Sequence, residues 1–354
     1  MKIGILTFHR AHNYGAVLQC YALQEVLKGM GHEVEVIDYR QPVIEKAYNH
    51  WSMLTLVKRF VKFWKLKRYI KLLIIESKKR RIFDSFKCQY LNIHHTCDAF
   101  TIPCDYDAYV VGSDQLFTTE ITGGLDKVYS GQFDKSDKSK LIGYAISSNA
   151  MAITEIGEKV WKSISTRFNA LSVREDSLVD MIEKLANVRF DVCVDPTLLT
   201  TETQWTQMCK CNVEDSDYIV MYEVRKLHDN PNMLQQKAET LANANNLRVV
   251  DLSSMMYHAD EWVNLIKNSR CVITSSFHAT VFALIFKKPL YAFCLNDGRD
   301  YRYTDLLKKV GANKIIMQSS ETPMAIPSLN YEEIANKIEQ IKLRSMNFLK
   351  EHLS

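Results

Sequence analysis

The sequence predicts an α/β protein of two domains, each built on a parallel sheet with helices on its faces. Its 354 residues are more than one hydrophobic core usually holds and enough for two. Hydrophobic residues make up 47% of the chain and charged residues 24%, close to the averages of globular proteins. Short apolar runs typical of buried strands alternate with segments of helical periodicity, in two series that indicate two domains.

The first series opens with a βαβ unit. Residues 2–8 (KIGILTF) form an apolar run typical of a buried parallel strand. Residues 16–30 carry apolar side chains at helical spacing, and Gly31 follows where a helix end favours a left-handed residue. The next strand is predicted at 33–39, and the crossover between the two strands should be right-handed.

The remaining elements follow the same rhythm. In the first domain, strands are predicted at 107–113, 140–147, 170–175 and 191–195. In the second domain, strands are predicted at 217–224, 247–253, 271–276 and 289–295, and helices at about 231–245, 260–268, from 278 onward and 304–310. A polar stretch at 200–217 separates the series, so we assign 1–205 to the N-terminal domain and 206–330 to the C-terminal domain. The last helix, within 331–354, is expected to pack back on the N-terminal domain.

Charge and cysteine content limit the compartment and the partners. A formal net charge of +4 is small for this length and gives no general affinity for nucleic acid. The nine cysteines are an odd set, and several lie in apolar runs, as free thiols of a reducing compartment do. The first residues lack the pattern of a signal peptide, and no run of about 18 apolar residues occurs. We therefore expect a cytoplasmic protein.

Ligands of such sheets bind beyond the carboxyl ends of the strands, which selects four turns. The first, residues 9–15, precedes a helix whose N–H groups could hold an anion beside Arg10 and two histidines. The chain has no GxGxxG or GxxxxGKS/T pattern, which leaves little support for a dinucleotide or P-loop site. Asn13, Tyr14 and Gly15 are the candidate ligand contacts. An ordinary loop in which Asn13 caps the helix is an equally good interpretation.

The second turn follows the strand at 107–113. Gly112 allows the backbone to approach a ligand closely, and Asp114 is placed to bind a sugar hydroxyl or to act as an acid or base. Ser113 and Gln115 complete this set of candidate contacts. A helix cap by Ser113 or Asp114 is the alternative, but the position at a strand end favours function.

The third and fourth turns supply an arginine and a histidine. Arg174 emerges from an apolar strand and needs a partner for its guanidinium group. Glu175 and a bound phosphate or carboxylate are both adequate partners, and local sequence does not choose between them. In the fourth turn, Ser275 and Ser276 precede His278 at a strand-to-helix junction. Because histidine exchanges a proton near neutral pH, a catalytic role is favoured over a structural one.

No metal or redox motif is predicted. His94, His95, Cys97 and Cys104 do not match a standard zinc spacing, and the C-x-C pair at 209–211 is not a redox motif.

The stretch 51–90 is basic and aromatic. It holds twelve Lys and Arg residues against Glu76 and Asp84, with eight aromatic residues. Within 54–65, apolar side chains fall on one half of a helix and basic ones on the other, which resembles a helix lying on anionic lipid. A helical insertion packed on the first domain with a solvated basic face is an equally good interpretation.

Five motifs, in order, resemble those of the polysaccharide pyruvyl transferase family. They are NYGAVLQCYALQ (13–24), VVGSDQLF (110–117), LSVREDS (171–177), VDPTLLTTETQW (194–205) and TSSFHATVFALIFKKP (274–289). The resemblance implies a glycosyltransferase-B-like pair of Rossmann-like domains with phosphoenolpyruvate bound in the cleft between them. It also implies an enzyme that places pyruvate as a ketal on sugars of cell-surface polysaccharides.

The same resemblance suggests roles for single residues. Arg174 corresponds to the family's anion-binding arginine, and His278 to its essential histidine. Many members have an arginine where this chain has Ser276, and Arg299 or Arg302 is expected to replace it.

The expected reaction protonates the methylene carbon of phosphoenolpyruvate, after which two sugar hydroxyls attack in turn and phosphate leaves. We expect Arg174 to hold phosphoenolpyruvate, His278 to carry the proton, and Asp114 to orient or deprotonate the acceptor. Phosphoenolpyruvate is a co-substrate, so no cofactor is expected. A lipid-linked acceptor would account for a basic segment at the inner face of the cell membrane, and no nucleic acid partner is expected.

Two other functions are compatible with these motifs. One is a glycosyltransferase that uses a nucleotide sugar in the same kind of cleft. The other is a non-catalytic glycan-binding relative, suggested by Ser276 and by Ala279, where the family usually has glycine.

Overall fold

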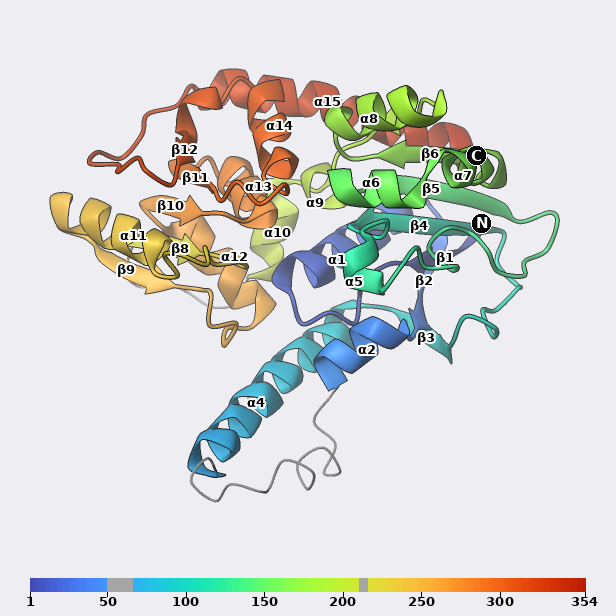
Figure 1. Cartoon of the computed structure of the whole chain (residues 1–354), viewed down its shortest axis with the longest axis horizontal. Helices are drawn as coiled ribbons and strands as arrows, with labels where there is room; N and C mark the ends of the chain where they lie inside the picture. The colour runs from blue at the N-terminus through green and yellow to red at the C-terminus, as the bar shows by residue number, and fades with distance from the viewer. Residues whose placement is uncertain (50–65, 210–215) are drawn as a thin grey trace.

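The N-terminal domain is built on a seven-stranded parallel sheet (Figure 1). The computed structural model describes residues 1–49, 66–209 and 216–354. The strand order is β3-β2-β1-β4-β5-β6-β7, and each neighbouring pair is parallel. The strands are β1 (Lys2–Leu6), β2 (Glu33–Tyr39), β3 (Ile93–Cys97), β4 (Ala108–Asp114), β5 (Lys140–Ile146), β6 (Ala170–Val173) and β7 (Asp191–Val192).

Helices cover both faces of this sheet, because parallel strands need crossover connections. On one face α1 packs through Val17 and Leu18, and on the other α7 packs through Trp161 and Ile164. The helices of this half of the chain are α1 (Tyr14–Gly29), α2 (Pro42–Asn49), α4 (Leu66–Tyr90), α5 (Thr119–Thr122), α6 (Ala150–Ile156), α7 (Glu158–Arg167), α8 (Asp176–Ala186), α9 (Pro196–Leu199) and α10 (Glu202–Met208).

The C-terminal domain has a five-stranded parallel sheet of order β12-β11-β10-β8-β9. Its strands are β8 (Tyr218–Tyr222), β9 (Arg248–Asp251), β10 (Cys271–Thr274), β11 (Leu290–Cys294) and β12 (Ile316–Gln318). Its helices are α11 (Met233–Ala244), α12 (Ala259–Asn268), α13 (Phe277–Ile285) and α14 (Tyr301–Lys309), with a short 3-10 turn, η2 (Asn313–Ile315). Because β10 is the central strand, α13 begins in the middle of the domain's carboxyl edge.

The last helix, α15 (Tyr331–His352), runs along both domains (Figure 1). The backbone N–H of Val194 donates to the buried Ser345 Oγ at 2.9 Å. Lys140 Nζ donates to the carbonyl oxygen of Ser354 at 2.7 Å. These two contacts attach the end of the chain to the N-terminal domain.

Aromatic side chains join the two domains into one continuous core. The Tyr14 ring stacks on Trp262 at 5.2 Å, and its hydroxyl donates to the carbonyl oxygen of Tyr257 at 2.8 Å. Trp205 meets Phe282 edge to face at 4.8 Å. Because this apolar contact is buried, it holds the carboxyl edges of the two sheets close together.

The predicted fold class, two Rossmann-like α/β domains in a glycosyltransferase-B-like pair, is confirmed. Two strands are absent from the sequence prediction, β3 and β12, and both lie at a sheet edge. Their side chains are mostly half-buried or exposed, so they lack the apolar runs of the central strands.

The described part of the basic stretch, residues 66–90, forms α4, which projects away from the two domains (Figure 1). Its last turns pack on the N-terminal domain through the buried Phe83 and Phe86. The proposed lipid-facing segment 54–65 lies outside the described residues. Among the described parts of the chain, none of the helices has the length and apolar content to cross a membrane.

Candidate active site

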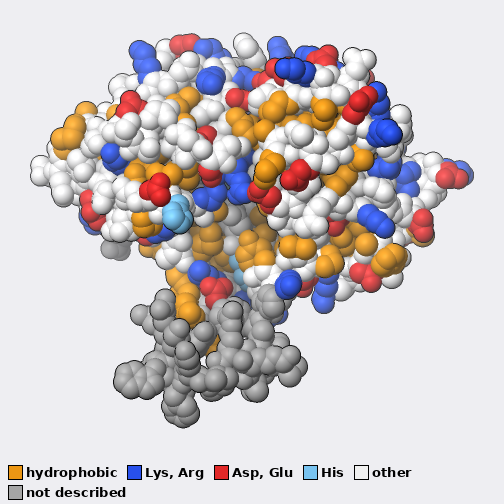
Figure 2. Space-filling model, in the orientation of Figure 1, with side chains coloured by type: hydrophobic (Ala, Val, Ile, Leu, Met, Phe, Trp, Pro, Cys, Tyr) orange, Lys and Arg blue, Asp and Glu red, His pale blue; other side chains and the backbone are white. Residues whose placement is uncertain are grey.

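A cavity of about 220 Å³ opens between the domains, at the carboxyl edges of both sheets. Figure 2 shows basic side chains gathered at this hollow. Eight of the residues selected from the sequence line it: Asn13, Asp114, Gln115, Ser275, Ser276, His278, Arg299 and Arg302. Residues that sequence reasoning did not select also line it, among them Tyr48, Arg225 and Phe277.

The first turn contributes less charge to the cavity than its sequence suggests. Asn13 caps α1 by accepting from the Ala16 N–H, and it also lines the cavity. Arg10 pairs with Asp38 at 2.7 Å and also with Glu45. His12 is packed between Tyr48 and Phe83, and burial lowers its pKa to about 4. Arg10 and His12 are therefore both engaged within the N-terminal domain and add no charge to the cavity.

Tyr14 and Gly15 do not line the cavity. Tyr14 is fully buried in the domain interface described above. Gly15 lies against the His278 ring so closely that an added Cβ would be 2.0 Å from Nδ1. The absence of a side chain at Gly15 therefore makes room for the histidine.

Two residues of the second turn pack inside the N-terminal domain, and two reach the cavity. Gly112 has a φ of +133°, and an added Cβ would lie 2.0 Å from the Tyr144 carbonyl oxygen, so its close neighbour is β5. Ser113 is buried and donates to the Ala145 carbonyl at 2.8 Å. Asp114 and Gln115 reach the cavity, where Gln115 Nε2 has no hydrogen-bond partner.

Arg174 is buried behind the cavity rather than exposed in it. Its Nη2 lies 2.8 Å from Asp195 Oδ2 and donates to Ser113 Oγ at 2.6 Å. Its guanidinium group stacks on the Phe277 ring at 4.7 Å. The ion-pair partner of Arg174 is therefore Asp195 and not the adjacent Glu175, which accepts instead from Ser147 Oγ at 2.8 Å.

Asp195 is the charged residue that sequence reasoning missed. Its side chain is fully buried, and its Oδ2 lies 3.5 Å from His278 Nε2 as well as beside Arg174. Burial favours the neutral acid, but Arg174, His278 and Thr197 outweigh it and hold the Asp195 pKa well below its ordinary value. The signal was available, because Asp195 ends a predicted strand at 191–195, where the strand-end rule already placed the other candidates.

Three arginines of the C-terminal domain line the cavity. Arg225 pairs with Asp297, and burial together with the nearby Arg302 lowers its pKa to about 10. Arg299 pairs with Glu120 of the N-terminal domain.

Arg302 donates from Nε to the Arg299 carbonyl at 3.2 Å. No carboxylate among the described residues lies within ion-pair distance of its guanidinium group, and burial lowers its pKa. A cation held in this way favours a bound anion.

The first turn of α13 adds donors to this corner of the cavity. Its N-cap residue, Ser276, makes no side-chain capping bond, and the Oγ of the buried Ser275 has no partner. N–H groups at a helix start attract negative charge. Together with Arg302 they form a site suited to a phosphate or carboxylate group.

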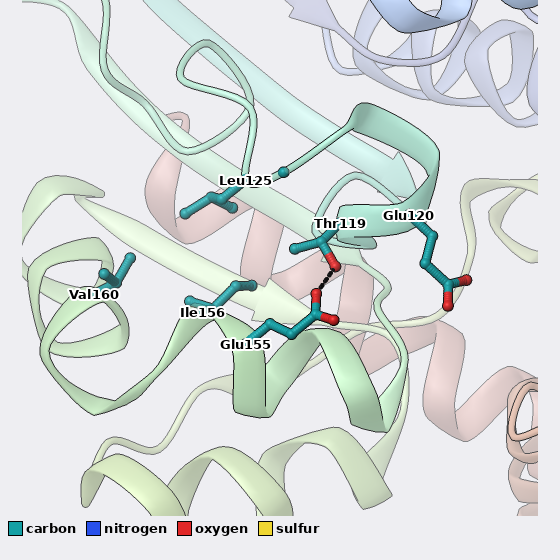
Figure 3. Close-up of a pocket in the computed structure, with 7 residues that line it drawn as sticks. Thr119, Glu120, Leu125, Glu155, Ile156 and Val160 are labelled. Carbon is teal, nitrogen blue, oxygen red and sulfur yellow. Dashed lines mark hydrogen bonds between the residues drawn. The ribbon is translucent and has the colours of Figure 1, made fainter.

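A second hollow, of about 470 Å³, lies on the N-terminal domain (Figure 3). Leu125, Ile156 and Val160 form its apolar part, and Thr119 is hydrogen-bonded to Glu155 beside them. It adjoins the cavity through α5, because Glu120 lines the hollow while Ile121 lines the cavity.

The described residues contain no group of three or more potential metal ligands. On β3, His94 is hydrogen-bonded to Asn92, and His95 lies 3.6 Å from Glu35.

Three comparisons with known proteins bear on this site. A family model described as polysaccharide pyruvyl transferase matches residues 13–293. A search of the curated proteins gave no match.

Solved structures resemble the chain at low identity. The UDP-GlcNAc 2-epimerase of Methanocaldococcus jannaschii is 12% identical, with 96% of this chain and 92% of that one covered and a TM-score of 0.47. The Neisseria meningitidis UDP-GlcNAc 2-epimerase, bound to UDP-GlcNAc, is 11% identical, with coverages of 100% and 99% and a TM-score of 0.47. The spinosyn rhamnosyltransferase SpnG is 8% identical, with coverages of 99% and 96% and a TM-score of 0.39. These likenesses carry no functional argument.

Gly15→Ala should displace the His278 ring, because the new methyl carbon would lie 2.0 Å from Nδ1. We expect the unfolding midpoint to fall, with a loss of about 1–3 kcal/mol typical of overpacking. Gly29→Ala in the same helix is the control, since nothing lies within 4 Å of its Cβ and alanine favours helix. Equal midpoints for the two variants in a thermal melt would contradict the close contact.

Glu175 should make the folded protein less stable as the pH rises from about 4.5 to about 7. Burial raises its folded pKa to about 7 from the ordinary 4.5, so between these values only the unfolded state releases the proton. The loss is complete above pH 7 and is on the order of 3 kcal/mol. Glu175→Gln removes this ionisation, so its unfolding midpoint relative to wild type should be higher at pH 8 than at pH 5. An equal difference at both pH values would refute the raised pKa.

Proposed function

The chain belongs to the polysaccharide pyruvyl transferase family, and from this premise we propose that it transfers pyruvate from phosphoenolpyruvate to a sugar as a cyclic ketal. The observation that carries the proposal is the cavity that is lined by His278, three arginines and the uncapped start of α13. Phosphoenolpyruvate is small and carries a phosphate and a carboxylate, which match these donors. The proposed reaction needs no cofactor.

The donor is held mainly by the C-terminal domain. Arg302 has no carboxylate partner among the described residues, and Ser275 Oγ has a free hydrogen-bonding position beside the start of α13. A planar guanidinium group binds phosphate or carboxylate through two parallel bonds. We therefore assign the anionic groups of phosphoenolpyruvate to Arg302, Arg225 and the first N–H groups of α13.

The reaction balances with the two substrates alone. A proton is added to the methylene carbon of phosphoenolpyruvate, and a sugar hydroxyl oxygen bonds to the adjacent carbon as it loses its proton. The bond from that carbon to the phosphate oxygen then breaks, and a second hydroxyl closes the ring and loses its proton. One hydroxyl proton thus replaces the proton placed on the new methyl group, and the other leaves with phosphate.

His278 is the group placed to move these protons. It lines the cavity at the start of α13, beside the proposed anion site. Asp114 and Gln115 reach the same cavity from the N-terminal domain, so an acceptor hydroxyl between the two domains would meet both walls. Asp114 then orients or deprotonates the acceptor, and His278 carries the proton.

Phosphoenolpyruvate should raise the unfolding midpoint of the protein, whereas UDP-sugars should not, because only a ligand of the folded cavity stabilises it. Arg302→Gln should remove this shift, and Arg189→Gln, at an exposed arginine outside the cavity, should preserve it. A shift with UDP-sugars alone would instead support a nucleotide-sugar glycosyltransferase.

His278→Gln should keep the shift with phosphoenolpyruvate but release phosphate about 10²–10⁴-fold more slowly, the usual contribution of acid–base catalysis. Activity is measured as phosphate release with candidate lipid-linked sugars, and mass spectrometry identifies added pyruvate. A folded His278→Gln protein with wild-type turnover would overturn the role of this histidine. No phosphate release from the wild type with any acceptor would favour a glycan-binding relative.

The acceptor is proposed to be lipid-linked, with α4 bringing the enzyme to an anionic membrane surface. The helix projects from the body and exposes Ile70, Leu72 and Ile74 among basic residues (Figure 1). Basic side chains near anionic lipid contribute about 1 kcal/mol each.

Co-sedimentation with vesicles should therefore increase with the fraction of anionic lipid and decrease with salt. Lys78→Glu combined with Arg81→Glu should weaken it, because both side chains are exposed on α4. Lys159→Glu combined with Lys184→Glu changes the net charge equally on exposed positions of α7 and α8 and should not. Vesicle binding that does not change with the fraction of anionic lipid would contradict this proposal.

A further inference from the structure

We propose that Asp195, held by Arg174, is the positioning residue of His278, and that Arg174 acts through this carboxylate rather than by binding the donor. The inference rests on the proposed pyruvyl transfer for its kinetic test. It concerns a residue outside the cavity, and it assigns a different task to Arg174 from the one that the family resemblance suggests.

The position of Arg174 favours this assignment. Its side chain is 2% exposed and does not line the cavity between the domains. The Phe277 ring covers its guanidinium group, and Phe277 and Arg302 line both the cavity and the adjoining pocket of about 20 Å³ that Arg174 lines. A donor bound in the cavity would therefore meet Arg302 and Arg225 before it met Arg174.

The two oxygens of Asp195 have separate partners. Oδ1 accepts from the backbone N–H of Thr197 at 3.0 Å and from its hydroxyl at 2.6 Å, which fixes the carboxylate at the start of α9. Oδ2 faces Arg174 Nη2 at 2.8 Å and His278 Nε2 at 3.5 Å. Oδ2 also accepts from Ser113 Oγ at 3.4 Å. One oxygen thus orients the carboxylate, and the other is shared by the arginine, the histidine and this serine.

This arrangement determines what the histidine can do. A carboxylate beside Nε2 favours the tautomer with the proton on Nε2, and it stabilises the imidazolium ion formed when the ring takes up a proton. Gly15, which has no side chain, leaves room for the Nδ1 edge of the ring. Nε2 has no hydrogen-bond partner among the described residues, and Asp195 Oδ2, at 3.5 Å, is the charged group placed to hold this edge.

The contact also links the two domains. Asp195 follows β7 of the N-terminal sheet, whereas His278 begins a helix of the C-terminal domain. The histidine therefore meets its carboxylate only when the domains are placed as they are here. Arg174 is needed in turn because an unpaired buried carboxylate would be strongly destabilising.

The kinetic test compares Asp195→Asn with Arg302→Gln. Asp195→Asn keeps the shape of the side chain and should lower kcat by about 10²-fold or more, with less than about a threefold change in KM for phosphoenolpyruvate. Arg302→Gln should instead change the KM for phosphoenolpyruvate more than it changes kcat. An Asp195→Asn enzyme with wild-type kcat, or one whose defect lies in KM, would overturn the proposal.

Variants of Arg174 show whether this arginine holds Asp195 in place or binds phosphoenolpyruvate. Arg174→Met should lower kcat as Asp195→Asn does, while phosphoenolpyruvate still raises the unfolding midpoint. Arg174→Lys, which keeps the positive charge, should recover part of kcat. If Arg174→Met instead abolishes the midpoint shift while Arg302→Gln preserves it, Arg174 binds the donor and the assignment is wrong.

A double variant distinguishes a defect in kcat from a loss of folding. Arg174→Met combined with Asp195→Asn removes both buried charges, so its stability should exceed that of Arg174→Met alone. Its kcat should nevertheless stay low. A double variant that recovers both stability and kcat would show that the pair is only structural.

Nitrogen-15 NMR of histidine-labelled protein tests the same contact without turnover, so it remains informative if pyruvyl transfer itself is wrong. The His278 signals, assigned by their loss in His278→Gln, should show the Nε2–H tautomer in the wild type near pH 8. In Asp195→Asn the new amide can donate to Nε2, so the population should move toward Nδ1–H. Unchanged His278 signals in Asp195→Asn would refute the contact, and no response to phosphoenolpyruvate in the wild type would speak against the proposed function alone.

Discussion

Asp195 is a carboxylate without access to water, and the candidate site is arranged around its charge. A buried ion is strongly unfavourable unless a counter-ion and hydrogen bonds compensate for the lost hydration. Arg174 supplies the counter-ion from the end of β6, and Thr197 satisfies the second oxygen. His278, from the other domain, and the Ser113 hydroxyl, which donates to Oδ2 at 3.4 Å, are further polar neighbours. Neutralising one carboxylate therefore brings two strand ends and the start of α13 to a single point.

The arginines of the site fall into two groups with different physical roles. Arg174 is bound through Nη2 to Asp195 and Ser113 and stacks on the Phe277 ring, while its Nε and Nη1 have no hydrogen-bond partner among the described residues. Arg302 lines the cavity and has no carboxylate partner among the described residues, so its charge is available to a ligand. In the proposed reaction, this separation would place an anion beside His278 while Asp195 orients the histidine from behind.

Local patterns predicted the elements better than the contacts. The apolar runs of β1, β2 and β4 and the periodicity of α15 mark buried faces, because burial repeats with the geometry of the strand or helix. The edge strands β3 and β12 were not predicted, since an edge strand is only half covered and needs no apolar run. The rule that ligands bind at strand ends selected part of the cavity lining, including Asp114 and His278, because that rule depends only on the direction of parallel strands.

The sequence by itself determined the family, the two parallel α/β domains, and the turns from which the cavity is built. Only the tertiary structure decided which charges meet. Arg174 stands next to Glu175 in the chain, yet it pairs with Asp195 across the sheet, and Asp195 meets His278 across the domain interface. Gly15 makes room for that histidine and not for a ligand, which no local pattern indicates. The physical reason is that burial follows from local periodicity, whereas the partner of a charge depends on distances between residues that only the folded chain brings together.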